Sequence, residues 1–372
     1  MRGSITFVIN GLGAGGAEKN LTILANAFAE RGLAVVIITF ENKNPFFLLH
    51  PEISVRPLGL ATKGLSLIHK FLRLPQIIYA LRREIQKTNS DAIVSFMDQA
   101  NIATIFATFG LGRRVIIAER INPFFSSLVE KGGPTARFFF LLRNFLYNCA
   151  HCVVVQTQGA AKCFSNLRTE VVVIPNPVVL PPHTPPDTKL QIPCILSIGR
   201  LVTQKRFDLV ILAFLEIYRL RPDWHLSVVG SGPLEDTLHC LAKGCPNIHF
   251  IPQTSTPHAL FREAEIVIQT SDYEGFPTVL LEAMSVGACV VATDCDFGPR
   301  DLIVSGKNGI LVECNSMAAV VTALTQLMDN ESERTRLGNA ASEIIDVYPL
   351  ERVVLSWLKL IHSTCSRTSF DG

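Results

Sequence analysis

Two basic residues that follow a predicted strand are the first candidates for chemistry. Arg200 and Lys205 lie five positions apart, just after the apolar run 194–198. An arginine fork and a lysine point charge that converge on one anion are suited to a diphosphate. The alternative interpretation of these residues is an exposed basic loop without a ligand.

Two acidic residues flank the start of a predicted helix. Glu274 precedes Gly275 and Pro277, and proline is favoured in the first turn of a helix. Glu282 follows two helical turns later among apolar residues. Such carboxylates suit a ligand whose hydroxyl groups they hold while the helix N-terminus binds its phosphates. Alternatively, Glu274 only complements the helix dipole and Glu282 lies on a solvated face.

A glycine-rich segment follows the first predicted strand and opens a helix. Within residues 10–18, Gly11, Gly13 and Gly16 match the pattern GxGxxG. Such a segment fits a dinucleotide site, a nucleotide-sugar site or a tight turn without a ligand. It lacks the GK[ST] ending of a P-loop, which argues against kinases and ATPases.

These residues need a scaffold of buried strands, and the rest of the sequence provides one. Short apolar runs alternate with helical patterns such as 18–31 and 74–86. This alternation predicts an α/β protein with parallel sheets covered by helices on both faces. The predicted strands lie at 5–9, 35–40, 92–96, 115–118, 152–156, 171–174, 194–198, 225–229, 248–251, 266–269, 288–292 and 309–312.

A cluster of prolines between positions 175 and 186 indicates a domain boundary. We therefore expect two doubly wound, Rossmann-like domains at about 1–175 and 192–345, joined by a proline-rich linker at 176–191 and facing each other across a cleft. Ligands of such sheets bind beyond the carboxyl ends of the strands, which predicts a site between the domains. The amphipathic stretch 350–362 is expected to pack back on the first domain.

Composition and charge narrow the class of protein. The chain has 372 residues, 48% of them hydrophobic and 18% charged, which excludes a disordered protein. The net charge of +2 divides into +9 for residues 1–180 and −7 for the rest, so one half is expected to meet an anionic partner. No apolar run reaches the roughly 18 residues of a spanning helix, and no signal peptide opens the chain, so a cytoplasmic protein is expected.

Together these features resemble the GT4 family of retaining glycosyltransferases, which have the GT-B fold. The matching segments are Gly15-Gly16-Ala17-Glu18, Gly199-Arg200-Leu201 with Lys205, residues 228–233 (VVGSGP), residues 271–277 (SDYEGFP), the E-x7-E pair Glu274 and Glu282, and residues 306–309 (GKNG). The run Glu119-Arg120-Ile121-Asn122-Pro123 is similar to that of bacterial members that build polysaccharides or lipid-linked oligosaccharides.

The resemblance implies a role for each residue of the donor site. Arg200 and Lys205 would neutralise the diphosphate of a sugar nucleotide. Glu282 would hold the ribose, and Glu274 would contact hydroxyl groups of the donor sugar and act with the two cations in catalysis. The other implied donor-binding residues are Gly15 and Gly16 at the diphosphate, Gln253 and Thr254 near the nucleobase, and Gly199, Gly275, Phe276 and Thr278.

The implied reaction is transfer of a hexose or N-acetylhexosamine from a UDP-sugar with retention of configuration. Fixed cations stabilise the departing phosphate, so no cofactor and no divalent metal is expected. The triplet Asp294-Cys295-Asp296 resembles the metal motif of a different glycosyltransferase fold. Because it precedes the family loop Gly298-Pro299, we interpret it as part of that loop.

The acceptor side is implied by the first domain. Glu119, Arg120 and Asn122 are candidates for contacts with the acceptor or the donor sugar, and the alternative is a buried ion pair that shapes their loop. The predicted acceptor is a glycan, linked to a polyprenyl diphosphate, and no nucleic acid is expected. Two basic stretches with apolar neighbours predict peripheral contact with an anionic membrane at the inner face of the cell. The alternative is that they are ordinary helices packed on the sheet, with solvated lysine and arginine side chains. The basic residues of these stretches are His69, Lys70, Arg73, Arg82, Arg83, Arg137 and Arg143.

Two other functions fit part of the sequence. A nicotinamide-dependent oxidoreductase would use the segment 11–16 and an acidic residue at the end of the second strand, for which Glu41 is available. That class gives no reason for the charged residues of the second domain. A non-catalytic carbohydrate-binding member is the other alternative, and the intact charged set argues against it.

Overall fold

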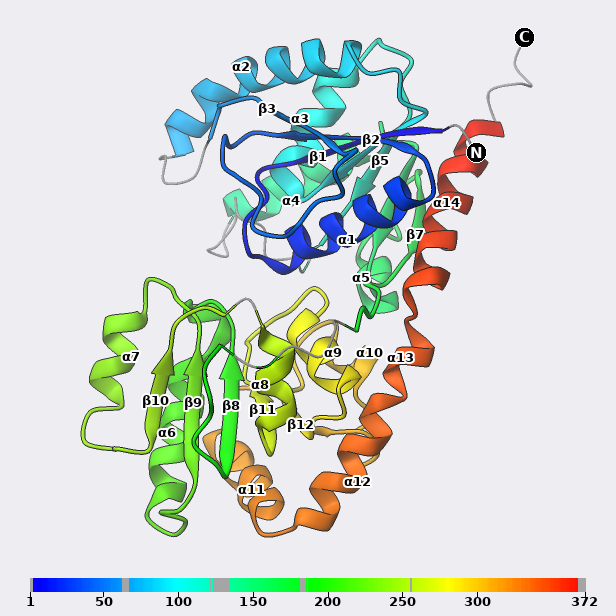
Figure 1. The fold of residues 1–372 in the computed structure, drawn as a ribbon. Helices are drawn as coiled ribbons and strands as arrows, with labels where there is room; N and C mark the ends of the chain where they lie inside the picture. The colour runs from blue at the N-terminus through cyan, green and yellow to red at the C-terminus, as the bar shows by residue number, and fades with distance from the viewer. Residues whose placement is uncertain are drawn as a thin grey trace. The chain divides into compact units, whose positions relative to one another are not determined.

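The computed structural model describes residues 3–61, 67–120, 122, 134–180, 185, 187–254 and 256–366. The chain divides into two compact units. Unit 1 consists of Met1–Asn176 and Glu351–Gly372, and unit 2 of Pro177–Leu350. In each unit a parallel sheet carries helices on both faces (Figure 1).

Unit 1 contains a seven-stranded parallel sheet with the strand order β3-β2-β1-β4-β5-β6-β7. The central strands are built from β-branched residues with nearly complete burial, as expected for strands covered on both faces. The strands are β1 (Ser4–Ile9), β2 (Ala34–Thr39), β3 (Ser54–Pro57), β4 (Ala92–Phe96), β5 (Val115–Ala118), β6 (Cys152–Val155) and β7 (Glu170–Val173). The helices are α1 (Gly16–Glu30), α2 (Leu67–Gln86), α3 (Asp98–Thr108), α4 (Pro134–Tyr147), α5 (Gln158–Cys163) and α14 (Leu350–Ser366).

Unit 2 contains a six-stranded parallel sheet with the order β10-β9-β8-β11-β12-β13. The strands are β8 (Cys194–Ile198), β9 (His225–Val229), β10 (Ile248–Ile251), β11 (Ile266–Gln269), β12 (Val290–Thr293) and β13 (Ile310–Val312). The helices are the 3₁₀ turn η1 (Thr203–Lys205), α6 (Phe207–Tyr218), α7 (Glu235–Leu241), α8 (Pro257–Glu263), α9 (Thr278–Ser285), α10 (Pro299–Leu302), α11 (Met317–Met328), α12 (Glu331–Ser342) and α13 (Ile344–Val347).

The predicted strands are present, and one further strand, β3, was not expected. Its sequence, Ser-Val-Arg-Pro, has no apolar run, and its residues are partly exposed. It lies at the edge of the sheet beside β2, where proline and charged residues are tolerated because, among the described strands, only β2 pairs with it.

The strand order places a topological switch point in each sheet. In unit 1 the order reverses between the neighbours β1 and β4, and in unit 2 between β8 and β11. Loops that leave two such strands turn to opposite sides of the sheet and leave a crevice at the carboxyl ends. These crevices are therefore where bound ligands are expected in each unit.

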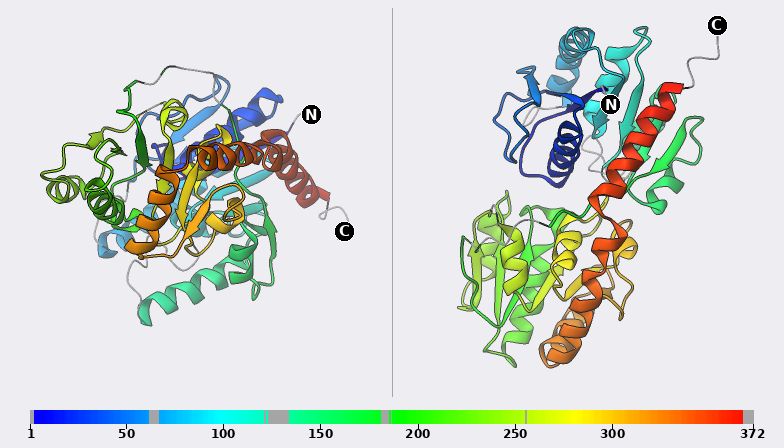
Figure 2. Two further views of the ribbon diagram at one scale, coloured as in Figure 1. Left: turned by 90° about the horizontal axis from the view of Figure 1, so that it is seen from below. Right: turned by 45° about the vertical axis from the view of Figure 1, so that its right-hand side comes forward.

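The chain returns to unit 1 as α14, drawn in red in Figures 1 and 2. Trp357 of α14 is 1% exposed and stacks on Phe96 at the end of β4, with the ring centroids 6.3 Å apart. Phe96 in turn contacts Phe7 of β1, which stacks on Phe28 of α1. This aromatic row packs the last helix into the core of the first unit.

Within the described residues, no helix is both long and apolar enough to cross a membrane.

Candidate active site

The charged residues predicted for the donor lie at the switch point of unit 2. The loop after β8 carries Arg200 and Lys205, and the loop after β11 carries Glu274. Because β8 and β11 are neighbours in the sheet, these loops leave from adjacent carboxyl ends. A backbone hydrogen bond from Asp272 N to Gln204 O, 2.9 Å long, joins them directly.

Lys205 and Glu274 form a partly buried ion pair. Nζ of Lys205 lies 2.5 Å from Oε1 of Glu274, with the two side chains 16% and 8% exposed. The pair brings together one cation predicted to meet the diphosphate and the carboxylate predicted to meet the sugar. In a sugar nucleotide the diphosphate and the sugar are joined by a single bond. Protein groups that contact both must therefore lie close together.

Two neutral side chains hold the same carboxylate in place. Oε1 of Glu274 accepts hydrogen bonds from Ser271 Oγ, at 2.6 Å, and from Gln269 Nε2. Gln269 is the last residue of β11, and both donors are buried. A buried carboxylate costs free energy unless its oxygens are hydrogen-bonded, and these donors and Lys205 together provide partners for Oε1 of Glu274.

The start of α9 follows Glu274 at the same sheet edge. Phe276 is buried and packs edge to face on Tyr348, which anchors the segment in the core. Pro277 precedes the first helical residue, Thr278. A Cβ on Gly298 would lie 2.4 Å from Cδ of Pro277, so only glycine lets the loop after β12 approach this helix start so closely.

Glu282 lies on α9 beside α8. Its Oε2 is 3.8 Å from Nε2 of the buried His258, and its side chain is 18% exposed. The carboxylate is thus a half-buried group on a helix that begins at the switch point. It is separate from the Lys205–Glu274 pair, consistent with a contact to a different part of a ligand.

Arg200 lies in the exposed part of the loop after β8. Within the described part of the chain its side chain makes no hydrogen bond or ion pair. The preceding Gly199 donates from its N–H to Val229 O at 3.0 Å. A Cβ on Gly230 would lie 1.9 Å from Gly199 O, so the ends of β8 and β9 can approach each other only because that position is glycine.

The two residues predicted near the nucleobase lie in the loop between β10 and α8. Gln253 is exposed. Thr254 Oγ1 accepts a hydrogen bond from Thr256 N at 3.0 Å and lies 3.3 Å from Asp187 Oδ2. Thr254 therefore orders the turn that starts α8, while a contact of either residue with a base remains a prediction.

In unit 1 the glycine-rich segment lies at the switch point of its own sheet. Gly15 precedes Gly16, the first residue of α1, so the segment ends at the N-terminus of a 15-residue helix. Asn10, after β1, donates to Gln99 of α3 across the switch point at 3.4 Å. The location suits an anion, as the sequence predicts for the diphosphate.

Glu119 is buried inside unit 1 at the end of β5. Its Oε2 accepts a hydrogen bond from Tyr147 Oη at 2.7 Å and lies 4.0 Å from Nη1 of Arg143. Burial raises the pKa of Glu119, while the charge of Arg143 opposes that rise. Asn101 Nδ2 donates to Tyr147 Oη at 3.2 Å and extends the network. Glu119 thus has buried partners in Tyr147 and Arg143, and its contact with the acceptor or the donor sugar remains a prediction.

Arg143 was wrongly predicted to belong to a basic membrane-facing surface. Its side chain is 5% exposed, and its guanidinium lies 5.0 to 5.7 Å from the ring centroids of Phe140, Tyr147 and Phe164. Cation–π contacts and Glu119 hold this charge in the interior. The structure does not describe the side chains of Lys70, Arg137 and several neighbouring residues.

Arg120 and Asn122 are also buried. The guanidinium of Arg120 contacts the rings of both Phe96 and Trp357, 4.7 and 5.5 Å from their centroids. Its Nη1 donates to Asn176 Oδ1 at 3.3 Å, and burial lowers the pKa of Arg120 to about 9. A contact of Arg120 or Asn122 with an acceptor remains a prediction.

The side chains of the Asp294-Cys295-Asp296 triplet do not converge to form a metal site. Asp294 forms an ion pair with Arg300 of α10, and the carbonyl of Asp296 faces Glu274 N at 3.5 Å. Among the described residues no cluster of three or more histidine, cysteine, aspartate or glutamate side chains could hold a metal ion.

Comparison with protein families identifies the chain. The model of glycosyl transferases group 1 matches residues 185–344, and that of the glycosyl transferase 4-like domain matches residues 15–177. The chain belongs to the group 1 glycosyltransferases. Both matched models describe glycosyl transferases, which favours this function over the oxidoreductase alternative. The first match spans the Lys205–Glu274 pair and α9, and the second begins at Gly15.

A relative is also named as a glycosyltransferase, and two solved structures share the fold of this chain. A Campylobacter jejuni protein named as an α-1,4-N-acetyl-D-galactosaminyltransferase acting on a GalNAc-containing, undecaprenol-diphosphate-linked glycan is 27% identical over 96% of this chain and 98% of its own length. Sucrose-phosphate synthase from Thermosynechococcus elongatus has a TM-score of 0.84 at 18% identity, covering 99% of this chain and all of its own. Staphylococcus aureus TarM, in a complex that contains UDP, has a TM-score of 0.78 at 15% identity, covering 97% of this chain and all of its own. The predicted GT-B fold is confirmed.

Sequence reasoning missed several residues that shape the site of this glycosyltransferase. Gln269 and Ser271 hold the carboxylate of Glu274, and Arg206 and Asp272 join the two loops on another side. Gln269 could have been noticed as a polar residue at the end of an apolar strand. Nothing in the sequence indicated that Arg206 and Asp272 meet, since 66 residues separate them.

Proposed function

We propose that this group 1 glycosyltransferase transfers a hexose or N-acetylhexosamine from a UDP-sugar to a lipid-linked glycan, with retention of configuration. The observation that carries the proposal is the Lys205–Glu274 ion pair at the switch point of unit 2, next to the start of α9. It combines a cation for phosphate, a carboxylate for sugar hydroxyls and a helix N-terminus at one sheet edge.

The proposed reaction breaks the bond between the anomeric carbon and the terminal phosphate oxygen of the donor. Negative charge then develops on the departing diphosphate, where Lys205 and Arg200 would stabilise it together with the N–H groups at the start of α9. The acceptor hydroxyl would form its new bond on the face from which UDP leaves, and its proton would pass to the departing phosphate. Glu274 would hold a donor-sugar hydroxyl, and Glu282 the ribose.

The relatives support the classes of donor and acceptor. The TarM complex contains UDP, and the Campylobacter relative is named for an undecaprenol-diphosphate-linked acceptor and an α-linkage. An α-linked product from an α-configured sugar nucleotide is the retaining outcome. With two cations assigned to the diphosphate, the proposal needs no divalent metal ion.

We also propose that unit 1 binds peripherally to an anionic membrane at the inner face of the cell. The support is a set of large apolar side chains exposed on helices that pack against one another, α2 on α3 and α3 on α4. Arg83 of α2 is exposed beside Tyr79, with its guanidinium 6.0 Å from the ring centroid. The apolar residues are Leu72, Tyr79, Phe106, Leu141, Leu142 and Phe145, together with Phe109 just after the end of α3. Exposed apolar and basic groups on such helices favour the membrane interface.

The test is a donor screen with the purified chain. UDP-, GDP- and ADP-sugars are supplied with a polyprenyl-diphosphate-linked glycan, nucleoside diphosphate release is measured, and the anomeric configuration of the product is read by NMR. We expect UDP release with at least one UDP-hexose or UDP-N-acetylhexosamine, an α-linked product, and the same rate in excess EDTA. Absence of release from every donor, together with binding of NADH, would refute the proposal in favour of the oxidoreductase.

A further inference from the structure

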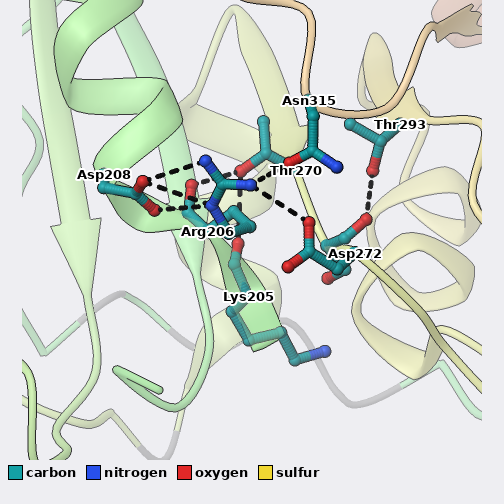
Figure 3. A network of polar contacts seen from close by, with 8 residues as sticks. Lys205, Arg206, Asp208, Thr270, Asp272, Thr293 and Asn315 are labelled. Carbon is teal, nitrogen blue, oxygen red and sulfur yellow. Dashed lines mark hydrogen bonds and ion pairs between the residues drawn. The ribbon is translucent and has the colours of Figure 1, made fainter. Parts of the chain in front are cut away.

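Arg206, the residue after Lys205, has an unusual backbone conformation. Its φ of 50° and ψ of 44° lie in the left-handed region, which side chains other than glycine, asparagine and aspartate rarely adopt. The turn separates η1 from α6 and directs the side chain of Arg206 away from that of Lys205 (Figure 3). Neighbouring residues thus present two cations to two different sets of partners.

The guanidinium of Arg206 joins three segments of unit 2 (Figure 3). Nε and Nη2 donate to the carboxylate of Asp208, in the first turn of α6, at 3.0 to 3.2 Å. Nη1 donates to Asp272 Oδ1, in the loop after β11, at 3.2 Å. Nη1 also donates to the side-chain oxygen of Asn315, in the loop after β13. One side chain therefore connects loops from separate strands.

The backbone of the same turn is fixed by the loop after β11. Thr270 Oγ1 lies within hydrogen-bond distance of two carbonyl oxygens, 3.2 Å from that of Lys205 and 2.8 Å from that of Arg206. Gln204 Nε2 donates to Tyr273 O at 2.6 Å. Hydrogen bonds of this kind restrain the main chain that carries Lys205, independently of where its ammonium group points.

Two ion pairs consequently join the same two loops. Lys205 pairs with Glu274, and Arg206 pairs with Asp272 two residues earlier. Asp272 is partly buried, and burial raises its pKa while Arg206 opposes that rise. Without the guanidinium, the carboxylates of Asp272 and Asp208 would lie close together without a cation between them, and their repulsion would separate the loops.

We propose that Arg206 is a positioning residue, which fixes Lys205 relative to Glu274 so that the ammonium group is already in place when charge develops on the departing diphosphate. This inference rests on the proposed function of the Lys205–Glu274 pair. Electrostatic stabilisation depends on groups that need no rearrangement during the reaction. A displaced Lys205 still attracts the donor, so turnover is affected more than donor binding.

The discriminating variant is Arg206→Gly. Glycine adopts the left-handed conformation without strain, so this change removes the guanidinium and keeps the turn. The matched control is Arg221→Ala, because Arg221 makes a similar two-point contact with Asp329 at 2.8 and 2.6 Å elsewhere in unit 2. A third variant, Asp272→Asn, removes the charge of the partner and keeps its shape.

We expect Arg206→Gly to lower kcat by about tenfold to hundredfold and to change the donor KM by less than about threefold. Asp272→Asn should also lower kcat, but by a smaller factor. The kcat of the double variant should be no lower than that of Arg206→Gly, because both substitutions remove the same Arg206–Asp272 contact. Arg221→Ala should leave both constants unchanged. A kcat for Arg206→Gly within about twofold of wild type, or additive effects in the double variant, would overturn the inference.

Hydrogen exchange provides a readout that does not depend on turnover. In Arg206→Gly the amides of 200–206 and 270–276 should exchange at least about tenfold faster, and those of β8 and β11 should not change. Equal exchange of both loops in wild type and variant would also overturn the inference. If wild type releases no nucleotide from any donor while the loops loosen as expected, the proposed function fails and the positioning role of Arg206 stands.

Discussion

Nζ of Lys205 lies 2.5 Å from Oε1 of Glu274, although 69 residues separate them in the chain. The contact exists because β8 and β11 are adjacent in the sheet while not consecutive in sequence. The two residues therefore form one site. In the proposed reaction, a sugar linked to a diphosphate would contact this site next to the bond that breaks.

Removing either partner of this pair should abolish most of the transfer. Lys205→Ala is expected to lower kcat by about a hundredfold to a thousandfold, because a charge that stabilises the leaving group is lost. It should also cost about 1–3 kcal/mol of unfolding free energy in unit 2, since a mostly buried carboxylate loses its counter-ion. Glu274→Gln should cost less stability, because the ammonium of Lys205 is partly exposed and becomes hydrated.

Steady-state kinetics and urea unfolding check both parts of this prediction. Glu331→Gln, at the exposed start of α12, is the control and should behave as wild type. Transfer at the wild-type rate in Lys205→Ala would remove the catalytic role from the pair. Equal destabilisation by the two variants would show that the charge of Lys205 is not needed to hold Glu274.

Glu282 should act on donor affinity rather than on turnover. Its carboxylate is assigned to the ribose, which does not change during the reaction, so its loss removes binding common to ground and transition states. Glu282→Ala should raise the donor KM and the dissociation constant of UDP about tenfold to hundredfold, the worth of a charged hydrogen bond. Calorimetry with UDP measures this directly. A normal UDP affinity combined with a reduced kcat would place Glu282 at the reacting centre instead.

The membrane proposal predicts a specific effect of one exposed aromatic residue. Phe145 of α4 is 70% exposed, and Leu220 in unit 2 is 72% exposed. Phe145→Asp should reduce binding to vesicles that contain anionic phospholipid by about tenfold or more, whereas Leu220→Asp should not. Sedimentation with vesicles of increasing anionic content measures the effect. Equal binding by both variants would exclude α4 from the contact.

The fold could be predicted from sequence because its strands are apolar runs between helical patterns. The edge strand β3 could not, since Val55 is its only strongly apolar residue. Lys205 and Glu274 were identified by spacing and resemblance, but their direct contact depends on the strand order. Arg206 was overlooked for a similar reason, because its partners Asp272 and Asn315 come from distant loops.

Arg143 shows the limit of reading helix faces from sequence. Apolar residues surround it on α4, a pattern that fits a membrane surface as well as a core. In the structure three aromatic rings and Glu119 enclose its charge. The enclosing Phe164 lies beyond α4, after α5, so the periodicity of α4 could not indicate it.

The burial of Glu119 predicts how stability depends on pH. Because burial raises its pKa above the ordinary value of 4.5, the folded state binds the proton more tightly than the unfolded chain does. Glu119 therefore contributes stability below that pH, and the contribution is lost as the pH rises through the folded-state pKa. Glu119→Gln cannot ionise and lacks this dependence. The stability of wild type relative to Glu119→Gln should fall as the pH rises above the ordinary pKa of 4.5, as measured by urea unfolding. A constant difference would mean that Glu119 is ionised throughout the measured range.

The packing of α14 on unit 1 should depend on Trp357. Its ring stacks on Phe96 and on the guanidinium of Arg120, and it is 1% exposed. Trp357→Ala should cost about 3–5 kcal/mol, the usual price of a large cavity in a core. Leu355→Ala, on the same helix but 54% exposed, should cost less than about 0.5 kcal/mol. Hydrogen exchange should place the loss in β1 and β4 of unit 1 and leave β8 and β11 of unit 2 protected. Comparable losses in the two variants would mean that Trp357 contributes no more than an exposed residue of the same helix.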